Sequence, residues 1–326
     1  MSNKTGPTPE ALRRHRDAQA LAYRCAETVG AGLEAGVTER EVARRMRAFL
    51  RDNGVEDFFH IPFAWFGERT AFRSLKGPWT PLHFFPTNKR LGEGMAYILD
   101  CSPVVDGYVS DIGYAGVLGD DPGANRIFDA LMRDLAQHRT VILERIKAGD
   151  TLSEVYAAVD ALIAQQGYES RHKVYPGRVI GHQVGRMTQR RNMGRYAFGF
   201  GLRTLETLGR EIVTEGIKGR SPLWAGGRAS RHVPTPGLWA VEPHIGFRDV
   251  GVKFEELLVV TEDDAFWLDD DLPHVRRWRK QAEQAAAAAA AEAPEAAPVL
   301  TGPTGPTGPT APTAPTAPAA LEGAPS

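Results

Sequence analysis

The segment MAYILDCSPVVDGYVSDIGYAGV, residues 95–117, contains two apolar runs that each carry an aspartate. Asp100 closes the first run, and Asp111 lies eleven residues later inside the second. Pro103 to Gly107, between the two runs, has the composition of a turn. Ionised carboxylates are rarely buried without a partner, so this pattern predicts a hairpin whose two acids belong to one polar site.

A second pair of acids follows the same plan closer to the C-terminus. Glu242 closes the apolar run 238–241, and Glu255 follows thirteen residues later. The turn of this second hairpin is expected between Gly246 and Gly251. Glu256 should point to the opposite face from Glu255, because side chains alternate along a strand.

An internal repeat surrounds these hairpins. Segments 36–54 and 149–167 each open and close with glycine, at an offset of 113 residues. Each copy contains Thr-x-x-Glu, beginning at Thr38 and Thr151, which is the capping box that satisfies free N–H groups at a helix start. Apolar residues then recur at helical spacing, and the matching lengths favour a duplication over two unrelated helices. Longer helices are expected before the two copies, at 9–34 and 124–147.

The order of elements is therefore helices, strands, helices, strands. This order predicts an α+β fold of two pseudo-symmetric halves, in which helices pack on a curved antiparallel sheet. We expect one folded domain over 9–281, preceded by a flexible N-terminal segment, 1–8. From Ala282 the chain is rich in alanine, proline and threonine, which predicts a disordered tail over 282–326.

The charge and cysteine content exclude several classes of protein. Lys and Arg number 39 and Asp and Glu number 40, so the formal net charge is −1, and we expect no nucleic-acid partner and no membrane partner. No run of about eighteen apolar residues occurs, and residues 1–14 lack the apolar core of a signal peptide. The two cysteines, Cys25 and Cys101, do not form a disulfide framework, so a cytoplasmic location is expected.

Four acids and a histidine form the candidate functional site. His182 lies in a strand-like segment bounded by Gly181 and Gly185. Carboxylates cannot gather in an apolar site unless cations neutralise them or some stay protonated. Carboxylate and imidazole donors suit Mn, Fe, Co or Zn, and this many donors suit two metal ions that share carboxylates. Taken one at a time, each acid could instead be a solvated turn or edge residue.

The order and spacing of the motifs resemble those of a known family. The motifs are Asp-Gly-Tyr-x-Ser-Asp at 106–111, Gly-His-x-x-Gly at 181–185, Val-Glu-Pro at 241–243 and Phe-Glu-Glu-Leu-Leu-Val-Val-Thr at 254–261. Over 9–268 the chain resembles the pita-bread metallopeptidases, which include methionine aminopeptidase, Xaa-Pro aminopeptidase and Xaa-Pro dipeptidase. The resemblance implies the pita-bread fold and a centre with two divalent ions. It also makes a homodimer a candidate oligomeric state. The implied metal ligands are Asp100, Asp111, His182, Glu242 and Glu255.

Three further positions bear on the substrate. His83, in His-Phe-Phe-Pro, matches the first substrate-contacting histidine of the family and favours the Xaa-Pro branch. Gln189 stands where active Xaa-Pro enzymes have a second histidine, and Lys253 stands where they usually have arginine. We expect the chain to lack the extra N-terminal domain common in that branch. Segment 186–231 is long and basic, and is either a solvated insertion or a lid that grips an anionic group.

The resemblance implies an exopeptidase that removes the N-terminal residue of short peptides, with Xaa-Pro substrates favoured. Two metal ions would share Asp111 and Glu255, and a hydroxide bridging them would attack the scissile carbonyl. Glu242 would carry the proton to the leaving nitrogen, and His83 would hydrogen-bond the substrate. Two alternatives are a hydrolase or lyase of the same fold acting on a non-peptide small molecule, and a non-catalytic binding module.

Overall fold

The computed structural model describes residues 6–73, 84–187, 195–197 and 199–292. The chain divides into two units, 1–285 and 286–326. The first unit contains all the sheets, and the described part of the second is the end of one helix. No helix among the described residues is long and apolar enough to cross a membrane.

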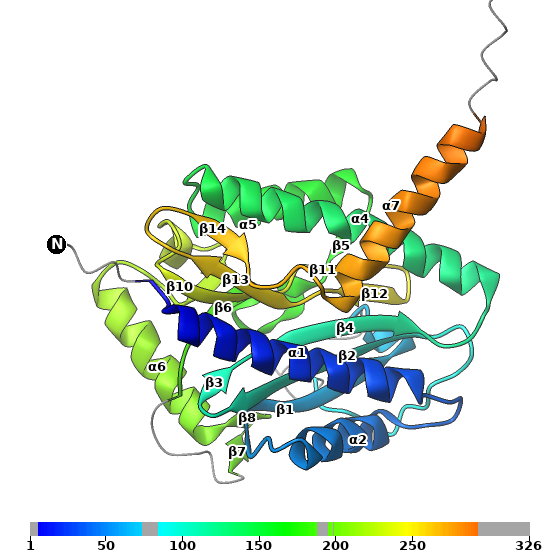
Figure 1. Ribbon diagram of the computed structural model, residues 1–326, viewed down its shortest axis with the longest axis horizontal. Helices are drawn as coiled ribbons and strands as arrows, with labels where there is room; N and C mark the ends of the chain where they lie inside the picture. Colours follow the sequence, from blue (N-terminus) through cyan, green and yellow to red (C-terminus); the bar gives the residue numbers. More distant parts are fainter. Residues whose placement is uncertain (1–5, 74–83, 188–194, 198, 293–326) are drawn as a thin grey trace, which may run out of the picture. The chain divides into compact units, whose positions relative to one another are not determined.

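The first half of the chain contains two helices followed by an antiparallel sheet (Figure 1). Its elements are α1 (Pro9–Ala31), α2 (Glu39–Asp52), β1 (Asp57–Phe66), the single 3-10 turn η1 (Gly67–Arg69), β2 (Ala96–Val105), β3 (Tyr108–Val109) and β4 (Ile112–Val117). In this sheet β2 pairs with β1, β3 and β4. Two short strands from later in the sequence, β7 (Tyr196–Ala197) and β8 (Phe200–Gly201), extend the sheet beside β1.

The second half repeats the order of two helices and then strands. It begins with α4 (Pro122–Lys147), α5 (Leu152–Gln165), β5 (Glu169–Ser170) and β6 (Val179–Val184). After α6 (Leu202–Ile217) come β9 (Leu223–Ala225), β10 (Gly237–Val241), β11 (His244–Phe247), β12 (Val250–Lys253), β13 (Glu256–Val260), β14 (Ala265–Trp267) and α7 (Pro273–Glu292). These strands form two sheets, ordered β14-β13-β10-β6-β9 and β12-β11-β5, and every pairing among the described strands is antiparallel.

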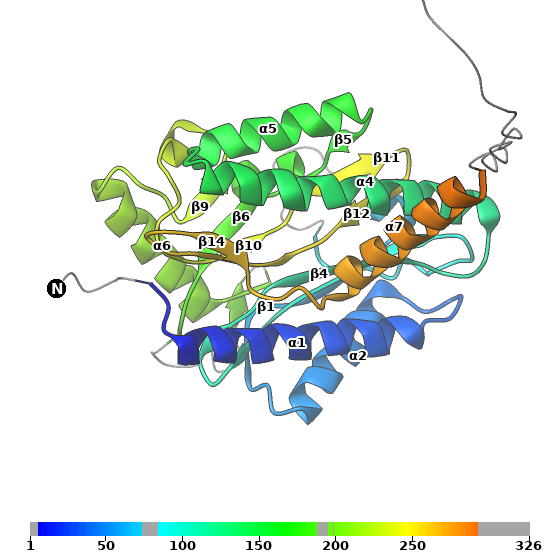
Figure 2. The same ribbon diagram turned by 45° about the horizontal axis from the view of Figure 1, so that its top comes forward.

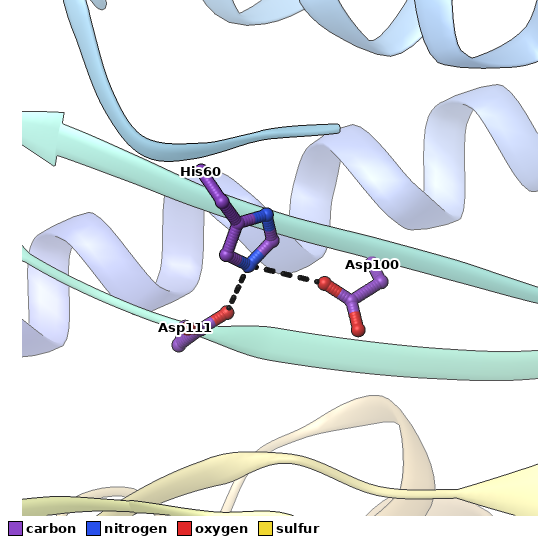
Figure 3. A group of neighbouring side chains, drawn as sticks. All are labelled: His60, Asp100 and Asp111. Atoms are coloured by element: carbon purple, nitrogen blue, oxygen red, sulfur yellow. Dashed lines mark hydrogen bonds and ion pairs between the residues drawn. The ribbon is translucent and has the colours of Figure 1, made fainter. Parts of the chain in front are cut away.

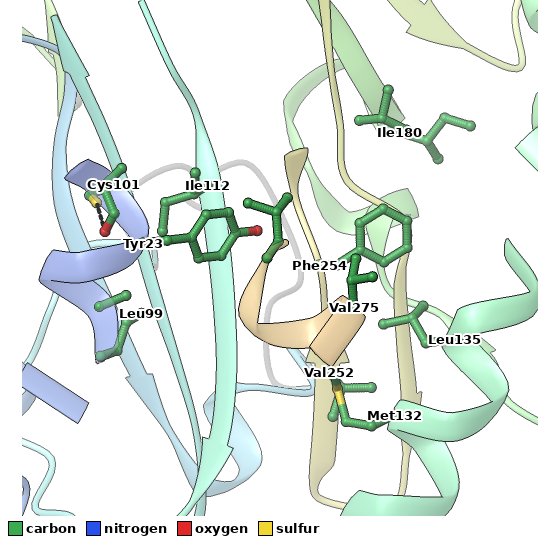
Figure 4. Packing of buried hydrophobic residues seen from close by; sticks show 14 of the residues in the cluster. Tyr23, Leu99, Cys101, Ile112, Met132, Leu135, Ile180, Val252, Phe254 and Val275 are labelled. Carbon is green, nitrogen blue, oxygen red and sulfur yellow. Dashed lines mark hydrogen bonds between the residues drawn. The ribbon is translucent and has the colours of Figure 1, made fainter. Parts of the chain in front are cut away.

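The strands of the two halves lie between two layers of helices. Helices α1 and α2 cover the strands of the first half, and α4 and α5 cover those of the second (Figure 2). Apolar side chains from both halves meet in one core, with Leu99 and Ile112 on one side and Val252 and Phe254 on the other (Figure 4). The predicted α+β architecture with two similar halves is confirmed.

The repeated helix pair forms as the capping motifs predict. The hydroxyl of Thr151 accepts the N–H of Glu154, and the Glu154 carboxylate accepts the N–H of Thr151, which completes the box. At Thr38 only the hydroxyl half is present, because Glu41 pairs with Arg45 one turn later instead. The box is therefore complete in the second copy and half formed in the first.

Both predicted turns are shorter than expected, because the strands run further. Strand β2 continues through Val105, and the turn is Asp106–Gly107, both at positive φ, as in a two-residue hairpin. In the second half, the segment between the two acids forms a hairpin of its own, β11–β12, that turns at 248–249. Gly246 and Gly251 are opposite each other inside that hairpin and are not turn residues.

Two predicted segments differ from the expectation or lie partly outside the described residues. Helix α7 continues to Glu292, past Ala282, where the tail was expected to begin. The rest of that segment, 293–326, lies outside the described residues. The basic segment 186–231 contains β7, β8, α6 and β9, so its described part carries secondary structure.

Candidate functional site

The four predicted acids and His182 lie where the two halves meet. Asp100 is on β2, and Asp111 lies in the connection between β3 and β4. Glu242 directly follows β10, and Glu255 directly precedes β13. All four carboxylates are buried, with no more than 8 % of any of these residues exposed. An isolated backbone bridge between Gly113 and Glu255 joins the two halves beside the site.

Hydrogen bonds from the surrounding backbone and from α1 fix the strands that carry the acids. The Ser102 hydroxyl donates to the Ser110 carbonyl, which holds the loop before Asp111 against β2. The Glu242 N–H donates to the carbonyl of Ile180 on β6. From α1, the Tyr23 hydroxyl donates to the Glu255 carbonyl at 2.6 Å, so a helix of the first half positions an acid of the second.

Asp111 is the centre of the arrangement because two imidazoles contact it from opposite halves. Its Oδ1 lies 3.0 Å from Nε2 of His60, and its Oδ2 lies 3.3 Å from Nε2 of His182. His60, on β1, also lies 3.3 Å from Oδ1 of Asp100 (Figure 3). Burial alone would raise the pKa of Asp111, but the two imidazoles outweigh it and lower that pKa below its ordinary value. Burial likewise opposes the charged form of His60, but Asp111 and Asp100 raise the pKa of His60 to about 9.

Lys253 supplies a buried cation on the other side of the acids. Its ammonium lies 2.7 Å from Asp100, 2.8 Å from Glu255 and 2.9 Å from Glu242. Burial alone would lower the pKa of Lys253, but the surrounding acids outweigh it and hold the pKa well above the ordinary value. Asp100 therefore contacts Lys253 through Oδ2 and faces His60 with Oδ1.

The site holds more negative charge than its own cations balance. Burial, followed by the charges of Asp111 and Glu242, raises the pKa of Glu255 well above its ordinary value. Burial also raises the pKa of Glu242, and the nearby ammonium of Lys253 offsets only part of that effect. Neighbouring carboxyl groups whose pKa values are raised by mutual repulsion bind a divalent cation favourably, because the cation neutralises the charge that repels them.

The donor atoms fit such cations. His60, Asp100 and Asp111 each offer a donor atom within 4.8 Å of the others, and Asp111, His182 and Glu255 do the same. The two groups share Asp111, as two neighbouring ions would require. Oδ1 of Asp100 is buried and accepts no hydrogen bond from the described residues, so it is available to bind a cation. Carboxylate with imidazole is the donor set of Mn, Fe, Co and Zn sites.

The structure places the predicted site residues as follows. The two donor groups contain four of the predicted ligands: Asp100, Asp111, His182 and Glu255. Glu242 belongs to neither group, and its carboxylate instead pairs with the ammonium of Lys253. Lys253, expected to bind substrate, is directed at the acids. His83 and Gln189 lie outside the described residues.

Glu256 faces away from the site, as strand alternation predicts. Its carboxylate pairs with Arg139 and His274 instead of facing the donor groups.

His60 belongs to one of the two donor groups, and the sequence analysis missed it. It is the one ionisable residue in the aromatic-rich segment 58–66 of β1, and that isolation is the signal that could have pointed to it. Aromatic rings enclose both imidazoles: Phe63 stacks on His60 at 5.1 Å between ring centroids, and Phe59 stacks on His182 at 5.3 Å. Such walls exclude water and strengthen electrostatic interactions inside the site.

The family model described as Metallopeptidase family M24 matches residues 13–262. The chain belongs to this family. The match covers both halves of the fold and all the residues of the two donor groups. M24 members are metal-dependent, which agrees with the donor atoms found here.

The curated relatives align with only part of this chain. An uncharacterized peptidase of Staphylococcus aureus (strain bovine RF122 / ET3-1) is 25 % identical over 175 residues, which is 53 % of this chain and 45 % of the relative. A second uncharacterized peptidase, from strain MSSA476, matches over the same shares. The chain thus spans about half the length of the curated relatives it matches.

Solved structures confirm the pita-bread fold. The X-Pro aminopeptidase from Thermotoga maritima MSB8 superposes with a TM-score of 0.58 at 17 % identity, over 83 % of this chain and 64 % of that one. The methionine aminopeptidase from Rickettsia prowazekii superposes with a TM-score of 0.54 at 16 % identity, over 81 % of this chain and 99 % of that one. At these identities the likeness establishes the fold alone.

Proposed function

We propose that this protein is a metal-dependent exopeptidase that removes the N-terminal residue from short peptides, with Xaa-Pro substrates favoured. The observation that carries the proposal is the pair of donor groups that share Asp111 inside a metallopeptidase fold. Two divalent ions fit this arrangement, and Mn, Co, Fe and Zn are the candidates. A cytoplasmic location and a homodimer stay predictions from the sequence and the family resemblance.

The protein's own residues account for the remaining requirements of peptide hydrolysis. When bound, the divalent ions would polarise the scissile carbonyl and acidify water. Glu242 accepts a proton and delivers it to the leaving nitrogen, a role that suits a carboxyl group whose pKa burial raises. Lys253 orients Glu242 and Asp100 through its ammonium. The rings of Phe59 and Phe63 keep bulk water from the reacting groups.

Substrate recognition is assigned to the positions that the family resemblance implies. His83 hydrogen-bonds the substrate or its developing oxyanion, and Gln189 donates a hydrogen bond without moving a proton. The basic segment 186–231 contacts an anionic group of the substrate, such as its terminal carboxylate. These three roles remain proposals from the sequence.

A non-peptide small molecule is the second candidate substrate for hydrolysis or lyase chemistry. Lys253 is the observation that favours it, since this residue stands where Xaa-Pro enzymes usually have arginine and its ammonium is directed at the acids. The fold alone does not choose between the two substrate classes.

The test combines metal content with peptide cleavage. The protein is stripped with a chelator, loaded with Mn, Co, Fe or Zn, and offered Ala-Pro and Ala-Pro-Ala, Met-Ala peptides and peptides without proline. N-acetylated copies of each peptide serve as matched controls, because an exopeptidase that reads a free N-terminus should not cleave them. Metal-dependent release of the first residue supports the proposal. A metal-loaded protein that cleaves none of these peptides would refute the peptidase function and favour the small-molecule alternative.

A further inference from the structure

Among the described residues, each half contributes one imidazole to the donor groups, and the family motifs name only His182 as a ligand. His60, on β1, is buried, with 6 % of the residue exposed, and contacts the same central carboxylate from the other side. Both histidines are oriented in the same way. Nδ1 of His60 lies 2.8 Å from the carbonyl of Ile61, and Nδ1 of His182 lies 3.3 Å from the carbonyl of Gln183.

This orientation determines which nitrogen can bind a cation. A backbone carbonyl accepts only, so Nδ1 must carry the hydrogen, and Nε2 is left with its lone pair in the neutral imidazole. A Nδ1–H bonded to a carbonyl is the usual second contact of a histidine that binds a metal through Nε2. Nε2 of His60 is directed at one oxygen of Asp111 and one oxygen of Asp100 (Figure 3).

Asp100 supplies the complementary observation. Its Oδ2 hydrogen-bonds the ammonium of Lys253, which hinders chelation of an ion by both oxygens of this carboxylate. Its Oδ1 is buried, accepts no hydrogen bond from the part of the chain that the structure describes, and lies 3.3 Å from Nε2 of His60. A buried carboxylate oxygen that accepts no hydrogen bond is costly beside an imidazole nitrogen unless a proton or a cation lies between them, and a divalent cation can take the place of the proton.

We propose that His60 is a protein ligand of the metal centre in addition to those named by the family motifs, so that His60, Asp100 and Asp111 hold one ion while Asp111, His182 and Glu255 hold the other. This inference rests on the proposed metal-dependent function. Nε2 of His60 would serve as a metal ligand in place of Oδ2 of Asp100, because that oxygen already accepts a hydrogen bond from Lys253. Each ion then has one imidazole, and this shifts the preference of the first ion from Mn towards Zn, Co and Fe.

The first measurement is metal content and affinity in His60→Gln. Glutamine can still donate an N–H to Asp111 but is a poor ligand, so a merely structural hydrogen bond would survive the change. We expect metal content to fall from about two ions to about one, with affinity for the lost ion reduced more than about 100-fold, beyond the roughly 10–100-fold cost of an outer-shell partner. His172→Gln is the matched control, since His172 is buried and lies 3.1 Å from Asp160 outside the centre.

The second measurement reads ligation directly. His60→Cys loaded with Co(II) should show a near-ultraviolet thiolate-to-cobalt band that the wild-type protein lacks. The wild type already contains Cys101 next to a ligand, so it controls for that thiol. If the variants fail to fold, X-ray absorption on the metal-loaded wild type still decides, because our proposal requires about one imidazole per ion and a single ligand histidine gives half that.

The outcomes separate this inference from the proposed function. Two tightly bound ions in His60→Gln, no cobalt–thiolate band in folded His60→Cys, or half an imidazole per ion would each refute His60 as a ligand and leave the peptidase proposal standing. Loss of one ion in His60→Gln without peptide cleavage by the wild type would support the ligand assignment and refute the peptidase.

Discussion

Replacing Lys253 with methionine removes the ammonium at nearly constant side-chain length. The ammonium lies within 2.9 Å of three acids, and the residue is 2 % exposed. Removing one partner of a buried ion pair costs about 3–5 kcal/mol. With three carboxylates losing their cation, we expect the free energy of unfolding of metal-free Lys253→Met to fall by about 4–5 kcal/mol. Protonation limits the loss, since the pKa of Glu255 is already raised.

The measurement is urea unfolding at pH 8, with chelator and then with saturating metal. Divalent ions replace the missing positive charge, and binding at 100 times the dissociation constant adds about 2.7 kcal/mol per ion, so saturating metal should raise the variant's own free energy of unfolding by more than half of the loss found without metal. Lys173→Met is the matched control, because Lys173 pairs with Asp160 at 2.8 Å but is half exposed, and its loss should cost less than about 1 kcal/mol. Equal small losses in both variants would refute the role given to Lys253.

Three further changes test the site and its surroundings. Asp111→Asn should remove both ions, because both donor groups contain this carboxylate, and elemental analysis that still finds two ions would contradict the shared position. Glu256→Gln should lower stability by about 3 kcal/mol through its buried pair with Arg139 while metal content stays at the wild-type value. Burial lowers the pKa of His138 to about 4, whereas an unfolded histidine titrates near 6.5. Its neutral form therefore stabilises the fold fully above pH 6.5, and about 2–3 kcal/mol is lost as the pH falls from 6.5 to 4. His138→Gln should show a smaller loss than the wild type when unfolding at pH 7.5 and pH 4.5 is compared, and identical losses would refute this origin.

The helix pairs could be predicted because their signals are local. Thr151 and Glu154 are three residues apart, so the hydrogen bond from the Glu154 N–H to the Thr151 hydroxyl at the start of α5 can be predicted from the sequence. Gly54 and Gly167, which close the two copies, adopt positive φ as a helix-ending glycine does. The carboxylates were also legible, since an acid inside an apolar strand is rare enough to require an explanation.

The glycines of the second hairpin were misread because their reason is long-range. A Cβ at Gly251 would lie 2.1 Å from the carbonyl oxygen of Thr70, and one at Gly246 would lie 2.6 Å from the Arg171 side chain. Glycine is needed there for close approach by distant segments. Nothing within the hairpin itself distinguishes such a glycine from one in a turn.

His60 could not be assigned from the sequence for a related reason. The register between β1 and β2 shifts on both sides of this residue, between Phe58 and His60 and again between His60 and Phe63. Alternation along an ideal strand therefore does not tell which face the imidazole takes, because each irregularity re-aims the side chains that follow it. The pairing that directs His60 at Asp111 exists only once β2 and the β3–β4 connection are in place.

The charge of the centre links Lys253 to the chemistry proposed for it. With both imidazoles neutral, as metal binding requires, the four buried carboxylates of the site share one ammonium, so three negative charges remain to be balanced. One divalent ion leaves the site negative, and two leave it with one positive charge. The net positive charge reached with two ions suits a site that must bind an anionic group of the substrate or of solvent in apolar surroundings. A single ammonium also leaves Oδ1 of Asp100 free, whereas the fork of an arginine could bind both oxygens of that carboxylate. Lys253 therefore balances part of the negative charge and leaves Oδ1 of Asp100 available as a metal ligand. In our proposal, His60 binds the same ion as that oxygen.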